Sequence, residues 1–117
     1  MERVLGIGGY FIRAADPEAL SAWYREALGL DIDDNGLWYP DAGPTVFAAF
    51  AAESDYLGPR TQQTMLNFRV RDLDAMLAQL RSRGAEVADE TEDMDGVGRF
   101  AWLCDPEGNR IELWQPA

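Results

Sequence analysis

The chain repeats one local pattern twice. In the first copy, residues that alternate between apolar and polar lead to Asp16, and an apolar spacing of helical period begins directly after it. The second copy shows the same change of period at Asp72, and aligning the two aspartates places Arg69 over Arg13. An internal repeat of this kind predicts two copies of one strand–helix unit that fold together as an α+β protein.

Both copies carry the signals of a helix that begins after the aspartate and ends at a glycine. A short side-chain oxygen at Asp16 or Asp72 can accept from the free N–H groups of the first turn. Gly29 and Gly84 suit the left-handed conformation that commonly ends a helix. The spacing predicts helices over 17–28 and 73–83, each with one apolar stripe: Leu20, Trp23, Tyr24, Ala27 and Leu28 in the first, Leu73, Met76, Leu77 and Leu80 in the second.

Short strands are predicted after each helix. The first half has strands over 30–33, 37–39 and 45–52, and Asn35-Gly36 predicts a tight hairpin turn between the first two. The second half has strands over 86–88, 99–104 and 110–114. We expect 53–63 to be an exposed linker and the acidic stretch 89–96 to be a solvated, mobile loop. Each half then reads βαβββ, and the two modules, about 1–54 and 62–117, form a single domain spanning 1–117.

A helix with one apolar stripe covers one face of its sheet and leaves the other face curved and open. The sequence therefore predicts a cupped mixed or antiparallel sheet with the helices on its outer face. Alternation along the closing strand places Ile111 and Leu113 under a helix and turns Arg110, Glu112 and Trp114 into the cup. For 99–104 both faces are apolar, and the alternation does not choose between them.

Composition excludes several classes of function. Histidine is absent, which excludes Ser-His-Asp and Cys-His nucleophile systems and every metal site that needs an imidazole. A formal net charge of −11 opposes binding to nucleic acid and to anionic membranes. Cys104 is the single cysteine, so no intrachain disulfide is possible, and we interpret it as a buried, inert thiol. No apolar run approaches a membrane span, and no signal peptide is evident, so we expect a cytoplasmic protein.

The repeat, the stretch 16–30 (DPEALSAWYREALGL) and the stretch 105–113 (DPEGNRIEL) resemble the vicinal-oxygen-chelate superfamily. This superfamily includes glyoxalase I, bleomycin-resistance proteins, fosfomycin-resistance enzymes and extradiol dioxygenases. The resemblance covers nearly the whole chain, and 105–113 looks like the closing hairpin of the family. It implies paired βαβββ modules and a homodimer.

The resemblance also implies where a metal would be held. In the metalloenzymes of this family, the first strand of each module supplies one ligand and the closing strand supplies a glutamate. Glu112 matches the glutamate, whereas the first-strand positions fall at about Gly9 and Met65, which are not ligands for a hard metal. The strand 45–52 contains no acid, amide or histidine to serve as a further ligand. We therefore expect no metal and no cofactor, as in the bleomycin-resistance proteins, which bind their drug without a metal.

The candidate ligand-binding residues are those that we expect to face the cup: Phe11, Arg13, Trp38, Phe47, Met65, Asn67, Arg69, Arg110, Glu112 and Trp114. Guanidinium groups in the cup would favour a carboxylate or phosphate ligand, whereas the net charge favours a cationic one. Alternatively, the arginines lie on the rim and pair with acids. Glu112 either accepts hydrogen bonds from a ligand or forms an exposed pair with Arg110. The aromatic residues either form a flat wall for a ligand or belong to the core or a dimer interface.

The leading functional hypothesis is a metal-free protein of the glyoxalase/bleomycin-resistance type that holds a small organic molecule in the cup. The alternative is a lactoylglutathione lyase-like enzyme, of the lyase, isomerase or dioxygenase kind, with Glu112 as its catalytic residue. That enzyme would use a non-standard metal site or metal-free acid–base catalysis. A third interpretation is a structural or regulatory dimer whose cup is filled. Whether the protein is an enzyme stays open at this level, and neither nucleic acid nor membrane is expected as a partner.

Overall fold

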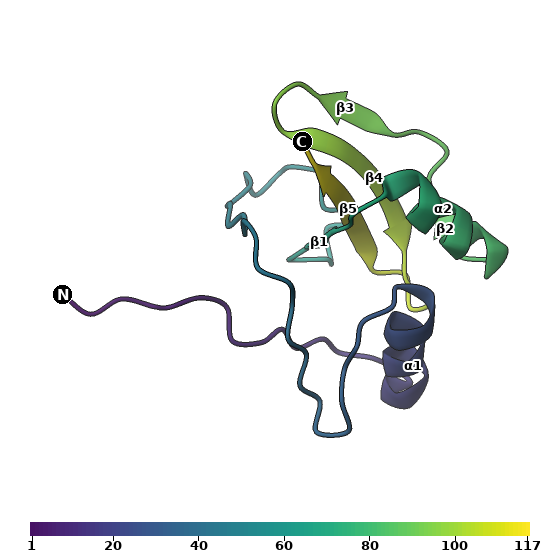
Figure 1. Ribbon diagram of the computed structural model, residues 1–117, viewed down its shortest axis with the longest axis horizontal. Coiled ribbons are helices and arrows are strands. Elements are labelled where there is room, and N and C mark those ends of the chain that lie inside the picture. The colour runs from purple at the N-terminus through teal and green to yellow at the C-terminus, as the bar shows by residue number, and fades with distance from the viewer.

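The computed structural model describes residues 1–117 and has two helices and one five-stranded mixed sheet (Figure 1). The elements are α1 (Pro17–Ala27), β1 (Leu66–Arg69), α2 (Leu73–Ser82), β2 (Glu86–Val87), β3 (Glu92–Met94), β4 (Gly98–Cys104) and β5 (Arg110–Pro116). The strand order is β1-β5-β4-β2, and β3 also pairs with β4. β1 runs parallel to β5, and the other pairings are antiparallel. The predicted α+β class is confirmed.

Both helices form where the repeat predicts them. The Asp16 carboxylate accepts a hydrogen bond of 3.0 Å from the Ala19 backbone N–H, and the Asp72 carboxylate accepts one of the same length from Ala75. Each helix ends just before a glycine with φ of 75°, at Gly29 and at Gly84. Local capping chemistry therefore sets both helix boundaries.

The two helices pack on the same face of the sheet. Their buried side chains form one core cluster with Ile111 and Leu113 of β5, as predicted, and with Ala101 and Leu103 of β4. The position of Ala101 and Leu103 decides the question that alternation left open. Because successive residues of a strand point to opposite faces, Phe100, Trp102 and Cys104 lie on the face away from the helices.

The turn between β4 and β5 fastens α1 to the sheet. Asp105 is buried there, and its carboxylate accepts a hydrogen bond of 2.8 Å from the Tyr24 hydroxyl of α1. Glu107, in the same turn, accepts from the backbone N–H groups of Ala15 and Asp16, at 2.6 and 2.9 Å. A carboxylate at a helix N-terminus also interacts favourably with the helix dipole.

The first half differs from the prediction, because residues 1–16 and 28–65 form no helix or strand. The strands expected before Asp16 and over 30–33, 37–39 and 45–52 are therefore wrong for this single chain. A strand forms only where a neighbour completes its hydrogen-bond ladder, and these segments have no such neighbour. The predicted turn is present: Gly36 has φ of 79°, and Asp33 N–H donates to the Leu37 carbonyl at 2.9 Å.

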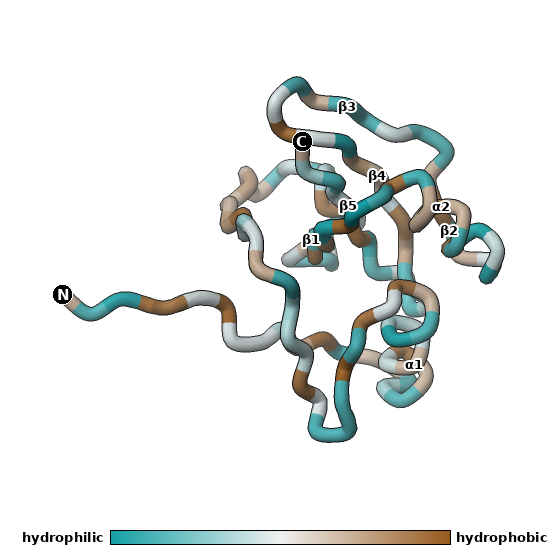
Figure 2. The backbone as a smooth tube through the Cα atoms, viewed as in Figure 1, coloured by the Kyte–Doolittle hydropathy of each residue, from teal (hydrophilic) through white to brown (hydrophobic).

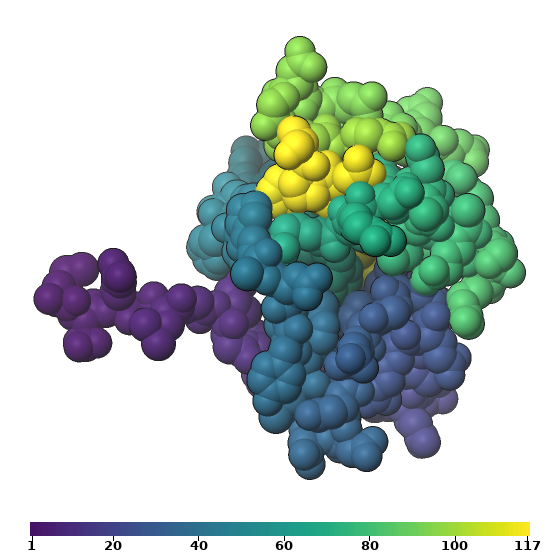
Figure 3. All heavy atoms as spheres, in the orientation of Figure 1, coloured from purple at the N-terminus to yellow at the C-terminus, as the bar shows by residue number.

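The first half also leaves much apolar surface in contact with solvent. Its N-terminal arm runs away from the body of the molecule (Figures 1 and 3), and hydrophobic segments lie along this half of the chain (Figure 2). The exposed large apolar side chains of residues 1–50 are Met1, Val4, Leu5, Ile7, Tyr10, Phe11, Ile12, Leu37, Trp38, Tyr39, Val46, Phe47 and Phe50.

In the second half, the acidic stretch 89–96 is more ordered than predicted. It contains β3, which pairs with β4, and Arg99 of β4 forms ion pairs with Asp93 at 3.2 Å and with Asp74 of α2 at 3.1 Å. The interstrand pairing explains why this acidic segment folds onto the sheet. No helix in the structure has the length and apolar composition that crossing a membrane requires.

Candidate functional site

The candidate site lies on the face of the sheet that the helices leave uncovered. Phe100 and Trp102 of β4 lie opposite Trp114 and Glu112 of β5 in the antiparallel register. Asn67 of β1 lies beside Glu112 on the other side. Glu112 is therefore the central residue of this face, with one side chain on each neighbouring strand directed towards it.

The Glu112 carboxylate accepts hydrogen bonds from three side chains. The Asn67 amide donates to it at 2.6 Å, the Trp102 indole N–H donates at 2.9 Å, and the Tyr56 hydroxyl donates to the same oxygen as Trp102. Glu112 is only 7% exposed. A buried charge is tolerated only when its hydrogen-bonding capacity is met, and here three donors meet it.

Tyr56 is held as a hydrogen-bond donor. Its partial burial, followed by its hydrogen bond to Glu112, raises the pKa of its phenol to about 12. Burial and the neighbouring carboxylate both disfavour the phenolate. Tyr56 therefore remains protonated and keeps donating to Glu112 throughout the neutral range.

The segment 53–63 is tied to the first residue of β5, so the predicted exposed linker is only partly correct. The Arg110 Nε donates to the Tyr56 carbonyl at 2.9 Å. Gln62 makes two bonds of 2.9 Å with Arg110: its side-chain oxygen accepts from the backbone N–H, and its amide donates to the carbonyl. Gln62 thus occupies the place of a neighbouring strand, and Tyr56, Leu57 and Gly58 are half-buried.

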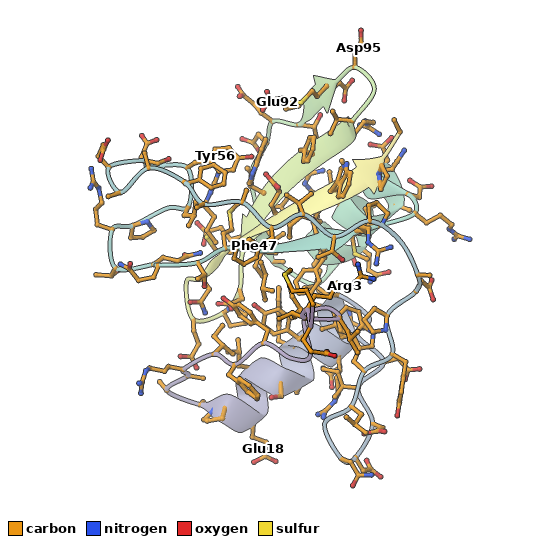
Figure 4. The ribbon with its side chains drawn as sticks, turned by 90° about the vertical axis from the view of Figure 1, so that its left-hand side faces the viewer. Arg3, Glu18, Phe47, Tyr56, Glu92 and Asp95 are labelled. Carbon is orange, nitrogen blue, oxygen red and sulfur yellow. The ribbon has the colours of Figure 1, made fainter.

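Aromatic rings surround Glu112 and Arg110. The Arg110 guanidinium carbon lies 5.9 Å from the centre of the Tyr56 ring and 5.5 Å from that of Trp102, within the range of a cation–π contact. Phe50 stacks on Tyr56 with a centroid distance of 5.3 Å and an interplanar angle of 10°. Tyr56 and Phe47 lie on coil segments beside the sheet (Figure 4). These rings form an aromatic wall next to the carboxylate.

Two hollows adjoin this face. The larger, of about 1960 Å³, separates the coil of the first half from the sheet, and most of the predicted site residues line it: Phe11, Trp38, Phe47, Met65, Asn67, Arg69 and Trp114. The smaller, of about 330 Å³, is lined in part by Arg13 and Arg110. Ligand pockets usually measure about 300–1,000 Å³, so the larger hollow exceeds a ligand's needs. It is wide because no strand of the first half closes over it.

The arginines fall into different environments. Arg69 donates to the Asp41 carbonyl at 2.8 Å, and Arg13 is exposed. The ion pairs of the structure are those of Arg99, so Arg110 and Glu112 do not form the exposed pair that the sequence left open as an alternative. Whether these arginines contact a ligand stays a prediction.

The residues around Glu112 do not fit the metal site of the related metalloenzymes. The structure gathers no group of three or more His, Cys, Asp or Glu side chains that could hold a metal ion. The Glu112 oxygens already accept hydrogen bonds from Tyr56, Asn67 and Trp102. The Tyr56 O–H and the Trp102 N–H are directed at the carboxylate and take the place of a cation there. We therefore derive no chemical step through a metal.

Cys104 lies on the same face, at the end of β4, and is half-buried. Burial, followed by the charge of Glu86, raises the pKa of its thiol. A thiol whose pKa is raised carries little thiolate at neutral pH and is a poor nucleophile. The interpretation of Cys104 as an inert thiol agrees with this environment.

The roles of Tyr56 and Gln62 were not predicted from the sequence. Both lie in a segment with Gly58-Pro59 that was expected to face solvent. The one signal that could have drawn attention to Tyr56 is the pair Tyr56-Leu57, an aromatic and an aliphatic residue within a mostly polar linker. Trp102 lies in the strand 99–104, whose inward face the alternation could not assign.

The fold and this site define a glyoxalase-type module that carries a hydrogen-bonded glutamate in its cup. The chain belongs to the glyoxalase-like domain family, whose model matches residues 9–114. Among curated proteins it is similar to the putative glyoxylase CFP32 of Mycobacterium bovis, with 42% identity over 50 residues. That match covers 43% of this chain and only 19% of the length of CFP32.

Solved structures of this superfamily share the fold. TnmS3, an antibiotic binding protein from Streptomyces sp. CB03234, is 26% identical, with all of both chains covered and a TM-score of 0.66. The fosfomycin resistance protein FosX from Listeria monocytogenes is 17% identical over 98% of this chain and 96% of its own, also with a TM-score of 0.66. Lactoylglutathione lyase from Agrobacterium tumefaciens is 18% identical over 97% and 96%, with a TM-score of 0.60. At these two lower identities the likeness concerns the fold alone.

Proposed function

We propose that this protein binds a small organic molecule on the open face of its sheet without using a metal. The observation that carries the proposal is the hydrogen-bonded carboxylate: Glu112 accepts from three side chains and is not part of a group of three side chains that could hold a metal. The aromatic wall beside it offers the flat apolar surface that a planar ligand needs. The similarity to TnmS3, which is described as an antibiotic binding protein, supports the binding of a small organic molecule.

The same contacts argue against the enzymatic alternative. A general base must reach the proton that it removes, and Glu112 is buried beneath Tyr56 and Trp102. Tyr56 could not replace it as a base at neutral pH, because its pKa is raised to about 12.

A thermal-shift screen against neutral, acidic and basic planar aromatic compounds tests the proposal. A ligand that binds only the folded chain stabilises it, by about 2.7 kcal/mol at one hundred times its dissociation constant. Phe50→Ala removes an aromatic ring that is 50% exposed, and should reduce the shift without unfolding the protein. Met94→Ala, equally exposed on β3, is the matched control and should leave the shift unchanged. If no planar aromatic compound stabilises the protein, the proposal is wrong.

We also propose that the functional form is a homodimer. In this dimer, segments of the first module, about 1–54, form strands. The apolar side chains of residues 1–50 and the wide hollow behind them support this proposal, since a chain alone leaves both open to water. A second copy of the chain supplies segments with the same pattern of alternation to complete the ladders. Sedimentation equilibrium should give the mass of two 13.1 kDa chains, and the mass of one chain at all concentrations would contradict the dimer.

A further inference from the structure

Arg110, on the open face, is fixed in place by several surrounding contacts. Its Nε donates to the Tyr56 carbonyl, and its backbone N–H and carbonyl are both bonded to Gln62. Gly58 lies against its aliphatic stem so closely that an added Cβ would stand 3.2 Å from Cδ. The guanidinium is therefore preorganised, and the Arg110 side chain would lose little further conformational entropy when a ligand binds.

The two terminal nitrogens of Arg110 have no partner in the protein. No hydrogen bond from them is formed, and no carboxylate lies within 4.0 Å of them, because both ion pairs of the structure belong to Arg99. Glu112, two residues along the same strand, is occupied by its own three donors. The guanidinium is thus unpaired even though the chain has 21 acidic residues and a net charge of −11.

One side of Arg110 borders a hollow without acidic side chains. The hollow of about 330 Å³ beside it is lined by 13 residues, which include Arg13 and no Asp or Glu. The rings of Tyr56 and Trp102 lie outside this hollow, against the guanidinium itself, and Phe50 stacks on Tyr56. A fork of two N–H groups matches the two oxygens of a carboxylate, and the rings match a flat apolar body.

We infer that the ligand of this site is an aromatic carboxylate whose carboxylate binds the free nitrogens of Arg110 while its ring lies against the neighbouring aromatic side chains. This inference rests on the proposed function and names the class of ligand. Direct contact with Arg110 outweighs the repulsion of a carboxylate by the net negative charge of the chain. Solvent ions screen a contact in a half-buried site less than they screen the charges of distant surface residues.

Titration calorimetry with 2-naphthoate and 2-naphthamide tests the inference, since the two probes share shape and differ in charge. The wild-type protein should bind naphthoate about tenfold more tightly or better, which corresponds to ~1.4 kcal/mol. Arg110→Met keeps the stem that packs against Gly58 and removes the charge, and it should abolish the preference. Arg110→Lys keeps the positive charge but lacks the paired N–H groups of the guanidinium, and it should retain only part of the preference for naphthoate. Circular dichroism verifies that both variants fold.

Arg83→Gln is the control for net charge, because Arg83 is exposed at the end of α2 and its loss changes the total charge equally. It should leave the preference for naphthoate intact. Equal binding of the two probes to the wild type would overturn the inference and leave the proposed function standing, as would a preference that survives in Arg110→Met. Failure of both probes to bind would also overturn the inference, whereas the proposed function fails only if no compound of the thermal-shift screen stabilises the protein.

Discussion

At the scale of single residues, Glu112 organises the open face. It is the central acceptor of three donors that come from β1, from β4 and from the segment 53–63. Removing the carboxylate therefore affects stability, since each donor would lose a partner in a half-buried place. The family resemblance implies a metal ligand at this position, whereas in this structure the Glu112 carboxylate accepts three hydrogen bonds.

Glu112→Gln tests this assignment. The new amide group turns N–H groups towards donors, so at least one of the three loses its acceptor, and the free energy of unfolding should fall by about 1–3 kcal/mol. Chemical denaturation monitored by circular dichroism measures the change. Glu90→Gln, at an exposed position, should change the stability by much less. Equal stability of the two variants would show that the hydrogen bonds of Glu112 contribute little.

Tyr56 makes the stability depend on alkaline pH. Its pKa is raised in the folded chain from 10.0 to about 12, so its contribution is complete below pH 10 and is lost as pH rises through 12. Tyr56→Phe should therefore lose stability less steeply than the wild type over this range. Tyr39→Phe, whose residue is 79% exposed, should follow the wild-type slope. Denaturation midpoints measured at several pH values decide between these outcomes.

At the scale of the elements, the hairpin of β3 and β4 depends on a glycine. Gly98 begins β4 with φ of 138°, a conformation that side chains rarely adopt. A Cβ at this position would overlap the Gln115 carbonyl oxygen of β5 and would lie 2.8 Å from the Trp114 indole nitrogen. The glycine thus permits β5 to approach the start of β4.

Gly98→Ala should lower the free energy of unfolding by about 1–3 kcal/mol, because the backbone and β5 must both shift. Gly8→Ala is the control, since a Cβ at Gly8 meets nothing within 4 Å and the backbone there needs no positive φ. Thermal unfolding of the two variants gives the comparison. A Gly98→Ala protein as stable as the control would contradict the close approach.

The elements also show which features could be predicted from the sequence. The helices were predictable because Asp16 and Asp72 cap them through neighbouring backbone N–H groups, which is a local effect. Alternation placed Ile111 and Glu112 on the correct faces, since β5 is flanked by strands on both sides. It failed for 45–52, because a strand also needs a partner that a single chain does not supply. Tyr56 could not be placed, since its contact with Glu112 joins distant parts of the chain.

At the scale of the whole molecule, the two halves of the chain behave differently. The second half builds the sheet, whereas the first half contributes α1 and a long coil with exposed apolar side chains. A monomer with this much exposed apolar surface would tend to associate. The dimer that we propose accounts for this surface and for the size of the larger hollow.

Phe47→Asp tests the dimer at a residue that is 91% exposed in the single chain. If 45–52 lies in the interface, a charge there must be buried without a partner, and the variant should sediment as one chain. Met94→Asp places the same charge on β3, outside the first half, and should remain dimeric. Dimers of unchanged stability for both variants would exclude Phe47 from the interface.

We propose that ligand binding needs no metal, and a titration with and without chelation tests this proposal. Binding of a planar aromatic ligand is measured on a single preparation before and after dialysis against EDTA, with the metal content of each sample determined. We predict the same dissociation constant in both samples and no stoichiometric transition metal in either. Binding that disappears on chelation and returns with one equivalent of a divalent metal would contradict the account.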